Sequence, residues 1–150
     1  MLELLIVIVI LALALSLSYP SLSKGSTALH LRATGRDILS TFRYAREKAV
    51  TEQAAMVLTV DQESQTLVLS DSYREGSRSY SLPRDIKIQR IALGETEVLE
   101  GPLVVRFLPN GSSDYAEITL RSDTGSLLRI VSDPITGGAR IESGHAESSR

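Results

Sequence analysis

The sequence of 150 residues contains no cysteine and no tryptophan, and its formal net charge is only −2. The lack of cysteine excludes a disulfide framework, a thiolate metal site and a cysteine nucleophile. The lack of excess positive charge argues against nucleic acid as a partner, because neutralising phosphates requires clustered Lys or Arg side chains. A chain of this size has room for one anchor segment and one domain of about a hundred residues.

A second absence is local: no charged side chain occurs between Leu4 and Tyr19, directly after Glu3. As a helix this stretch rises about 24 Å, slightly less than the ~30 Å hydrocarbon core of a bilayer. In lipid or in the core of an assembly the backbone must satisfy its own hydrogen bonds, which favours a helix. We therefore expect a transmembrane or filament-core helix whose apolar residues are Leu4, Leu5, Ile6, Val7, Ile8, Val9, Ile10, Leu11, Leu13, Leu15 and Leu17.

From the residues alone, two other interpretations of the apolar stretch remain open. The first is a cleaved secretory signal, because Ala12-Leu13-Ala14 resembles a small-residue cleavage site, although the residues before the stretch are not basic. The second is a simple signal anchor. The nearest basic residues, Lys24 and Arg32, follow the stretch. By the positive-inside rule they would keep the main domain in the cytoplasm, unless basic residues before Met1 are missing.

The apolar stretch is followed by a proline and then by an amphipathic pattern. Pro20 ends or kinks the first helix, because its ring blocks the hydrogen bond to the carbonyl four residues earlier. Beyond it, apolar and small residues recur at alternating steps of four and three, which predicts a helix that continues to about residue 52 if the kink is mild. The small residues of this stripe suit a helix that lies close on a sheet. The stripe consists of Leu31, Gly35, Ile38, Phe42, Ala45 and Ala49.

From Met56 onward the hydrophobic period changes to two, which predicts strands. Asn110-Gly111 is the strongest turn signal, because this pair adopts positive φ at little cost, and we expect a loop at 94–101. The pattern predicts an α+β arrangement in which the helix covers one face of antiparallel sheet, built from seven or eight short strands. The predicted strand segments are 57–60, 66–69, 78–82, 86–91, 103–107, 117–120, 127–131 and 140–141.

These patterns divide the chain into four parts, with no internal repeat. Residues 1–20 form the hydrophobic transmembrane or filament-core segment, and residues 21–53 form the amphipathic continuation of the helix. Residues 54–142 form the antiparallel β domain, and residues 143–150 form a polar tail.

Several groups of residues carry a resemblance to a known family. Leu2-Glu3-Leu4-Leu5-Ile6-Val7, followed by the apolar run and Pro20, is similar to a pilin amino terminus after leader removal. Residues 39–60 are similar to the helix end and first strand of the family. Residues 107–113, 118–120, 129–131 and Thr136-Gly137 are similar to its carboxy-terminal hairpins. Over nearly its whole length the chain thus resembles the minor pseudopilin H proteins of type II secretion systems, and the related T-type minor pilins.

The resemblance implies a function, a location and partners. The function is that of a minor pseudopilin near the tip of a short periplasmic filament, whose extension drives export of folded proteins. The location is the bacterial inner membrane, crossed once, with the carboxy-terminal domain in the periplasm. The partners are other pseudopilins, inner-membrane lipid and secreted cargo.

The resemblance also implies processing at the amino terminus. Family precursors carry a basic leader that ends in Gly, and a prepilin peptidase cuts it before a Phe that becomes N-methylated. The printed sequence begins at Met1, inside that region. We therefore expect a trimmed leader or a misplaced start codon.

Glu3 is the candidate residue for assembly and register. An unpaired carboxylate in lipid or in a filament core is costly, so it must take a proton or find a cation. The resemblance implies that its partner is the terminal amine of the adjacent subunit. The alternative is a position at the level of the lipid headgroups, where an acid is favourable at a helix amino terminus.

Other candidate sites have weak signals. His30 and His145 lie far apart in sequence with no motif around either, and metal binding needs more ligands. Ser112-Ser113-Asp114 lacks the Gly-x-Ser-x-Gly elbow of a hydrolase, so we expect a turn. Asp123 and Asp133 lie in ordinary turns without the clustered oxygen ligands that calcium requires. We therefore expect an assembly protein, not an enzyme, with no cofactor and no metal.

Two alternative functions stay open. The first is a minor type IV pilin that acts in pilus biogenesis or DNA uptake, although residues 140–147 space their basic side chains among acids. The second, less favoured, is an exported enzyme or binding protein whose amino-terminal segment is a cleaved signal. Amino-terminal sequencing separates them, because a start after Ser18 indicates a cleaved signal and a methylated amine near Leu2 indicates a pilin.

Overall fold

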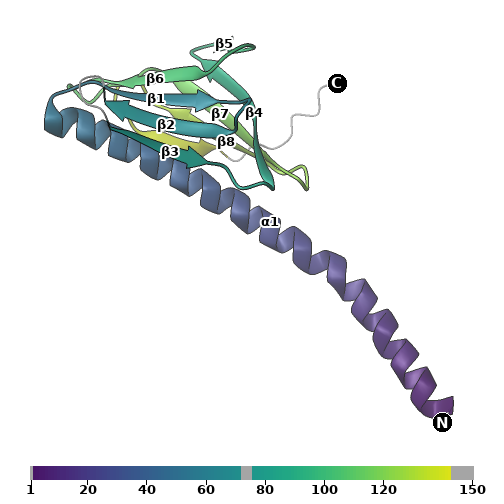
Figure 1. The fold of residues 1–150 in the computed structure, drawn as a ribbon. Coiled ribbons are helices and arrows are strands. Elements are labelled where there is room, and N and C mark those ends of the chain that lie inside the picture. Colours follow the sequence, from purple (N-terminus) through teal and green to yellow (C-terminus); the bar gives the residue numbers. More distant parts are fainter. Residues whose placement is uncertain (1, 72–75, 143–150) are drawn as a thin grey trace.

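The structure, a computed structural model, describes residues 2–71 and 76–142, and for residues 14–26 it describes only the helical backbone. One long helix, α1 (Leu2–Glu52), begins the chain and leads into a β domain (Figure 1). Its amino-terminal half projects away from this domain, and its carboxy-terminal half lies along it. Pro20 therefore does not end the helix. Its side chain, like those of Leu15 and Leu17, lies outside the described residues, and the kink stays a prediction.

The helix ends where the sequence changes from helical to alternating periodicity. After Glu52, Gln53 takes a left-handed φ of 50°, and the N–H of Ala54 donates a hydrogen bond of 3.2 Å to the carbonyl of Ala49. Such a bond satisfies one of the last carbonyls of a helix and turns the chain out of the helical path. The chain then enters the first strand at Met56.

Nine strands follow, and they form two antiparallel sheets among the described residues. The first sheet has the order β3-β2-β1-β6, and the second has the order β5-β4-β7-β8-β9. The helix contacts strands of both sheets, not one sheet face as the sequence pattern predicted. The strands are β1 (Met56–Asp61), β2 (Thr66–Asp71), β3 (Ser77–Ser81), β4 (Ile86–Leu93), β5 (Thr96–Glu97), β6 (Leu103–Phe107), β7 (Ala116–Ser122), β8 (Leu127–Ser132) and β9 (Ala139–Glu142).

All eight predicted segments are strands, and the one addition is β5. This two-residue strand pairs with the end of β4 inside the segment that we expected to be a loop. Its two side chains are exposed, so no hydrophobic alternation marks it in the sequence. The left-handed φ of 63° at Gly94 is what folds the chain back onto β4.

The helical stripe predicted from the sequence is buried against the sheets. Thr34, which lies beside it, is a buried polar residue that the pattern did not include. A Cβ on Gly35 would lie 2.9 Å from Cδ2 of Leu128 and 3.3 Å from Cδ1 of Ile141, so the helix backbone approaches β8 and β9 closely there. The six residues of the stripe, all buried, are Leu31, Gly35, Ile38, Phe42, Ala45 and Ala49.

An aromatic pair lies at the centre of the core. The rings of Phe42 on α1 and Phe107 on β6 meet edge to face, with centroids 5.5 Å apart and an interplanar angle of 83°. Both side chains are at most 1 % exposed. Edge-to-face geometry lets the positive edge of one ring contact the negative face of the other. The pair therefore joins the helix to the first sheet through packing.

The two sheets are also joined by glutamine side chains from the β1–β2 turn. The main-chain N–H of Ile88 donates to Oε1 of Gln65 at 2.6 Å, and Nε2 of Gln62 donates to the carbonyl of Gln89 at 2.9 Å. These acceptors and donors lie at the β-bulge where the pairing of β4 with β7 shifts register, between Ile88 and Arg90. A bulge leaves backbone groups unpaired. The glutamine side chains satisfy them.

Candidate functional site

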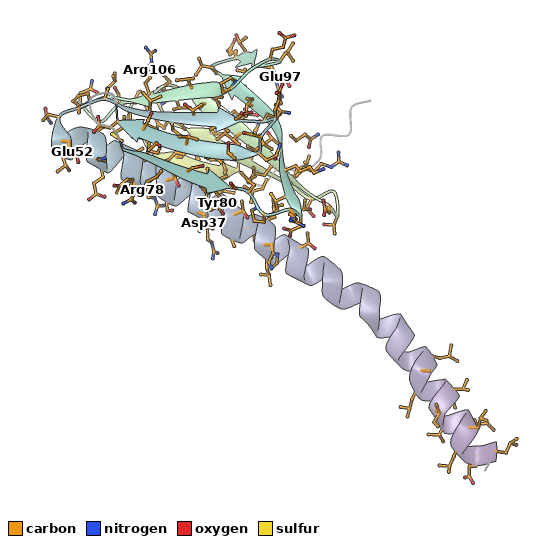
Figure 2. The ribbon with its side chains drawn as sticks, in the orientation of Figure 1. Asp37, Glu52, Arg78, Tyr80, Glu97 and Arg106 are labelled. Carbon is orange, nitrogen blue, oxygen red and sulfur yellow. The ribbon has the colours of Figure 1, made fainter. Side chains whose placement is uncertain are left out.

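The first candidate site is the projecting end of α1. The large apolar side chains from Leu2 to Leu13 are between 48 % and 78 % exposed, on every side of the helix (Figure 2). A helix that is apolar all round is stable only when other apolar groups cover it. Residues 2–13 form an apolar rod. Its exposed surface requires a partner.

Glu3 lies in the first turn of the rod, where it is exposed. A carboxylate is favourable at this position because the unpaired N–H groups of a helix amino terminus carry partial positive charge. Among the described side chains, no cation forms an ion pair with Glu3. Within the described part of the chain, no helix combines the length and the apolar character needed to cross a membrane.

A second cluster joins α1 to two distant turns. Nε of Arg46 donates a hydrogen bond of 3.2 Å to the carbonyl of Gly111, in the turn between β6 and β7. Gly137, in the turn between β8 and β9, is so close that a Cβ on it would lie 2.2 Å from the same carbonyl oxygen. Gly111 and Gly137 have φ of 86° and 62°. The structure thus brings together the Asn-Gly turn and the Thr-Gly pair that carried the family resemblance.

The turn that holds Gly137 is organised by Asp133. Its carboxylate accepts hydrogen bonds from the N–H groups of Ile135 at 2.9 Å and Thr136 at 3.3 Å. These bonds, first the one from Ile135, lower the pKa of the Asp133 carboxyl. The N–H of Gly137 then donates to the carbonyl of Asp133 at 2.8 Å. Asp133 therefore works as a turn residue, as its sequence context predicted.

Asp114, in the segment between β6 and β7, pairs with Arg106 on β6. Its carboxylate accepts bonds from Nε of Arg106 at 2.9 Å and from the main-chain N–H of Arg106 at 3.0 Å. Burial raises the pKa of Asp114, but the bonds and the charge of Arg106 outweigh burial and lower it. The same pairing raises the pKa of Arg106. This pair could not be predicted from the sequence, because its residues belong to different elements of the predicted pattern.

We expect Asp114 to make stability depend on acidity. Because its pKa is lower in the folded protein than the ordinary value of about 3.9, its contribution is present above about pH 4 and is lost as pH falls through the folded pKa. Asp114→Asn should lower the free energy of unfolding by about 1 kcal/mol at pH 7, a modest value because Arg106 is exposed. It should also flatten the decline below about pH 4. Chemical denaturation of the full chain in detergent, at a series of pH values, measures both.

The control for this prediction is Glu100→Gln, at an exposed acid outside any strand. It should leave both the stability at pH 7 and the acid decline unchanged. An Asp114→Asn variant whose acid profile matches that of the parent would contradict the role of Asp114.

The remaining sequence candidates occupy ordinary structural positions. Nδ1 of His30 lies 3.1 Å from Oδ2 of Asp85, and the Ser113 hydroxyl is directed at the main-chain carbonyls of Asp114 and Asp133, at 3.3 and 3.5 Å. Asp123 donates its N–H to the carbonyl of Asp85. Residue 145, the second histidine, lies outside the described residues. Within residues 2–71 and 76–142, no three His, Asp or Glu side chains are grouped as a metal site requires.

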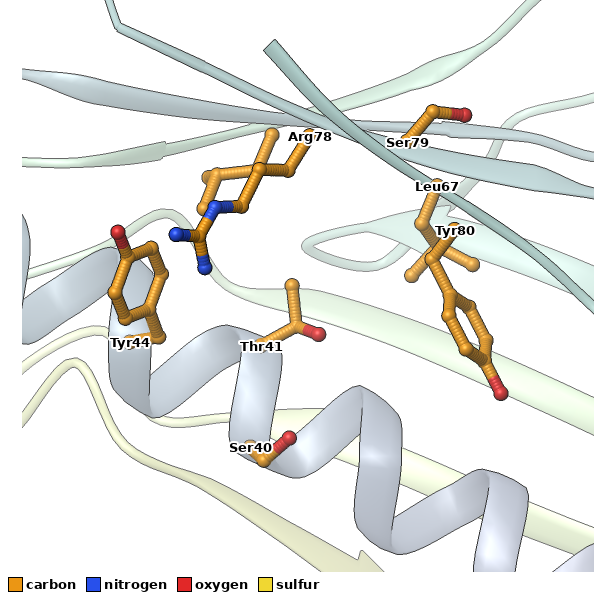
Figure 3. A pocket seen from close by; sticks show the side chains of 8 residues that line it. Ser40, Thr41, Tyr44, Leu67, Arg78, Ser79 and Tyr80 are labelled. Atoms are coloured by element: carbon orange, nitrogen blue, oxygen red, sulfur yellow. The ribbon is translucent and has the colours of Figure 1, made fainter. Parts of the chain in front are cut away.

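The sequence did not reveal a groove between α1 and β3. It has a volume of about 450 Å³ and lies beside an exposed edge of the first sheet (Figure 3). Arg78 reaches toward the helix from β3, with its guanidinium carbon 4.8 Å from the centroid of the Tyr44 ring. The residues that line the groove are Ser40, Thr41, Tyr44, Leu67, Leu69, Arg78, Ser79 and Tyr80.

Comparison with known structures supports the fold. A structure of the minor pseudopilin EpsH from the type 2 secretion system of Vibrio cholerae matches with a TM-score of 0.60 at 11% identity, over 75% of this chain and 95% of that one. A crystal structure of EpsH from the same system matches with a TM-score of 0.63 at 11% identity, over 79% of this chain and 97% of that one. At this identity the likeness shows a shared fold. Comparison with curated protein sequences gives no match.

Comparison with protein families identifies the chain through its folded domain. The family model described as type II transport protein GspH matches residues 34–136. The match begins beside the buried stripe of α1 and ends one residue before Gly137, so it includes the helix end and the Arg46–Gly111 contact. It spans more than half of the chain. The chain therefore belongs to the GspH family of type II transport proteins.

Proposed function

We propose that the chain is a minor pseudopilin that assembles through the rod into the pseudopilus of a type II secretion system. The observation that carries this proposal is the contrast between the two halves of α1. The second half buries its stripe under the sheets of its own chain, whereas the rod is apolar on every side and exposed. A surface of this kind is covered by equivalent helices of other subunits in a filament core, or by lipid before assembly.

The location follows from the same surface. Before assembly we propose that the apolar helix holds the protein in the bacterial inner membrane, with the β domain in the periplasm. The apolar helix continues beyond the rod through uncharged residues as far as Tyr19. Transfer of such side chains into lipid is favourable by several tenths of a kcal/mol each. Other pseudopilins then replace lipid as the neighbours of the rod.

We propose that Glu3 sets the register of assembly. Once sister helices cover the rod, the carboxylate of Glu3 leaves water, and an unpaired buried charge is strongly destabilising. The positive terminal amine of an adjacent subunit removes this penalty at one axial position. Positions without a partner for Glu3 are therefore disfavoured, even though the ion pair itself contributes little net stability.

The test is replacement of Glu3 in cells that express the complete precursor. Glu3→Ala should reduce incorporation into sheared pseudopili at least tenfold, because the variant no longer distinguishes the correct register. The amount of protein in the inner membrane should stay the same, since alanine is at least as compatible with lipid as a carboxylate. Quantitative immunoblotting of the filament and membrane fractions measures both amounts.

Glu63→Ala, at an exposed acid in the β1–β2 turn, is the matched control and should assemble normally. Full incorporation of Glu3→Ala would remove the register role. A native protein that is dissolved in the periplasm without residues 2–13 would overturn the proposed function itself.

A further inference from the structure

We propose that the free edge of β3, with the groove beside it, binds an extended acidic segment of a neighbouring subunit by strand addition. The inference rests on the proposed function in one respect only, that the chain works within an assembly of different subunits. It assigns a second contact, on the β domain and separate from the rod. Three observations carry it: the backbone edge, the groove and the charge of Arg78.

The first observation is a strand edge with free hydrogen-bonding groups. The N–H of Leu82 donates to the carbonyl of Gln65, so Leu82 faces β2. In an antiparallel pair the residues alternate in the side to which their backbone groups point. Hence Arg78 and Tyr80 bond to β2, in register with Leu69 and Leu67, and the intervening serines point their N–H and C=O groups away from the sheet. These serines are Ser77, Ser79 and Ser81.

The opposite edge of the same sheet is covered at the end that contains Arg106 and Phe107. On β6 the main-chain N–H of Arg106 donates to the Asp114 carboxylate, and its carbonyl accepts from the N–H of Asp114. Phe107 forms a further bridge with Ser113. On β3, by contrast, no described residue bonds to the outward groups of the serines. Proteins usually protect such an edge by charge, proline or a covering segment, and the one charged side chain of β3 points toward the helix instead.

The second observation is the groove between β3 and α1 (Figure 3). Leu67 and Leu69 of β2 form its apolar base, and Tyr44 on the helix forms one wall. A smaller cavity of about 280 Å³ continues it past Lys48 and shares Tyr44, Leu69 and Arg78 with it. A strand added to β3 would place alternate side chains into this space, because side chains opposite each other point to the same face.

The third observation is the charge at the centre of the groove. The guanidinium of Arg78 lies over the ring of Tyr44, and none of the ion pairs among the described residues involves Arg78. Lys48 lies farther along the same groove, where its Nζ is 4.0 Å from Oε1 of Glu52. A residue opposite Arg78 on an added strand would therefore best be acidic, since opposite charges across strands are favourable. A neighbouring residue two positions away would contact Tyr80 and the leucines, and would best be apolar.

These requirements define the occupant as an extended segment with the pattern apolar, polar, acidic, polar, apolar. A second copy of this chain does not supply it through β3, because Ser77–Ser81 contains no acid and would bring one Arg78 close to another. Recognition of this kind uses main-chain hydrogen bonds for affinity and alternate side chains for specificity.

The test uses the full chain in detergent and the peptide Thr-Val-Thr-Glu-Thr-Val-Thr-amide, which carries fluorescein on its amino-terminal amine. Its palindromic sequence presents the same pattern in either strand direction. Fluorescence anisotropy should show saturable binding below ~1 mM, the range of a weak specific contact. Arg78→Glu should weaken binding at least tenfold, and should bind the peptide with Lys in place of Glu at least tenfold more tightly than the parent chain does.

Ser79→Pro tests the backbone part of the proposal. Proline removes an N–H that points away from β2, so the β2–β3 pairing stays intact while one bond to the added strand is lost. We expect this variant to lose peptide binding at least tenfold. Val104→Pro is the matched control, because Val104 lies two residues from Arg106, on the opposite edge of the same sheet, and it should bind normally.

Each outcome decides between the alternatives. Absence of saturable binding, or equal binding by the parent chain and Arg78→Glu, overturns the inference. Should Ser79→Pro fail to fold, the charge-swap pair still decides, because it leaves the strand intact. If the peptide does not bind while incorporation into pseudopili still depends on Glu3, only the proposed strand addition at β3 is refuted. Loss of the rod from native material refutes the proposed function, whatever the peptide does.

Discussion

Replacing Gly137 by alanine is expected to lower the free energy of unfolding by about 3 kcal/mol or more. Two costs add. The φ of 62° at Gly137 is left-handed, which costs an L-residue about 1–2 kcal/mol. The new Cβ would also lie 2.2 Å from the carbonyl oxygen of Gly111, a main-chain atom that cannot move aside without moving its turn. Chemical denaturation of the full chain in detergent measures the change.

Gly125→Ala separates the two costs. Gly125 has a φ of 84°, but a Cβ there would meet no atom within 4 Å. Its replacement should cost only the conformational part, about 1 kcal/mol. If both variants lost the same stability, the contact between the two turns would have no energetic role. A larger loss for Gly137→Ala indicates that the β6–β7 and β8–β9 turns are held together through this approach.

Replacing Phe42 by alanine is expected to cost about 4 kcal/mol. The ring is almost fully buried at the junction of α1 and the first sheet, and its removal leaves a cavity that the surrounding structure fills only in part. The edge-to-face contact with Phe107 is lost as well, which contributes about 0.5–1.5 kcal/mol beyond burial. The same denaturation experiment measures the loss.

The matched control is Leu29→Ala on the same helix, because Leu29 is 65 % exposed. It should change stability by no more than about 0.5 kcal/mol. The stability loss of Phe42→Leu should lie between those of Phe42→Ala and Leu29→Ala, since leucine retains apolar volume but lacks the aromatic contact. A loss below about 1 kcal/mol for Phe42→Ala would mean that the helix end and the sheet are not packed as one core.

The fold could be predicted where burial imposes a period on the sequence. The stripe of α1 is buried because its residues recur at helical spacing, and the alternating segments are strands because one of their faces is buried. Strand β5 could not be predicted, since it has two exposed residues and is held by main-chain bonds to β4. The division into two sheets was also hidden. It depends on which strands pair, and hydrophobic alternation is the same in either sheet.

The candidate sites divide in the same way. The apolar rod and Glu3 are visible in the sequence because an uncharged run with one acid is a local feature. The meeting of Arg46, Gly111 and Gly137 is not, because it joins residues that are far apart in the chain. A signal existed in the two turn motifs, each of which contains a glycine that the structure holds at positive φ. The groove beside β3 left no signal, since its serines are unremarkable residues for a strand edge.

Because α1 is one continuous helix, its length fixes the orientation of the β domain about the helix axis relative to the rod. Each residue of a helix turns the chain by about 100° and advances it by about 1.5 Å. Inserting one alanine between Leu13 and Leu31 would therefore swing the whole domain by roughly 100° around the axis while lifting it by only about 1.5 Å. The direction in which the β domain faces is therefore set by the number of residues between the rod and the buried stripe.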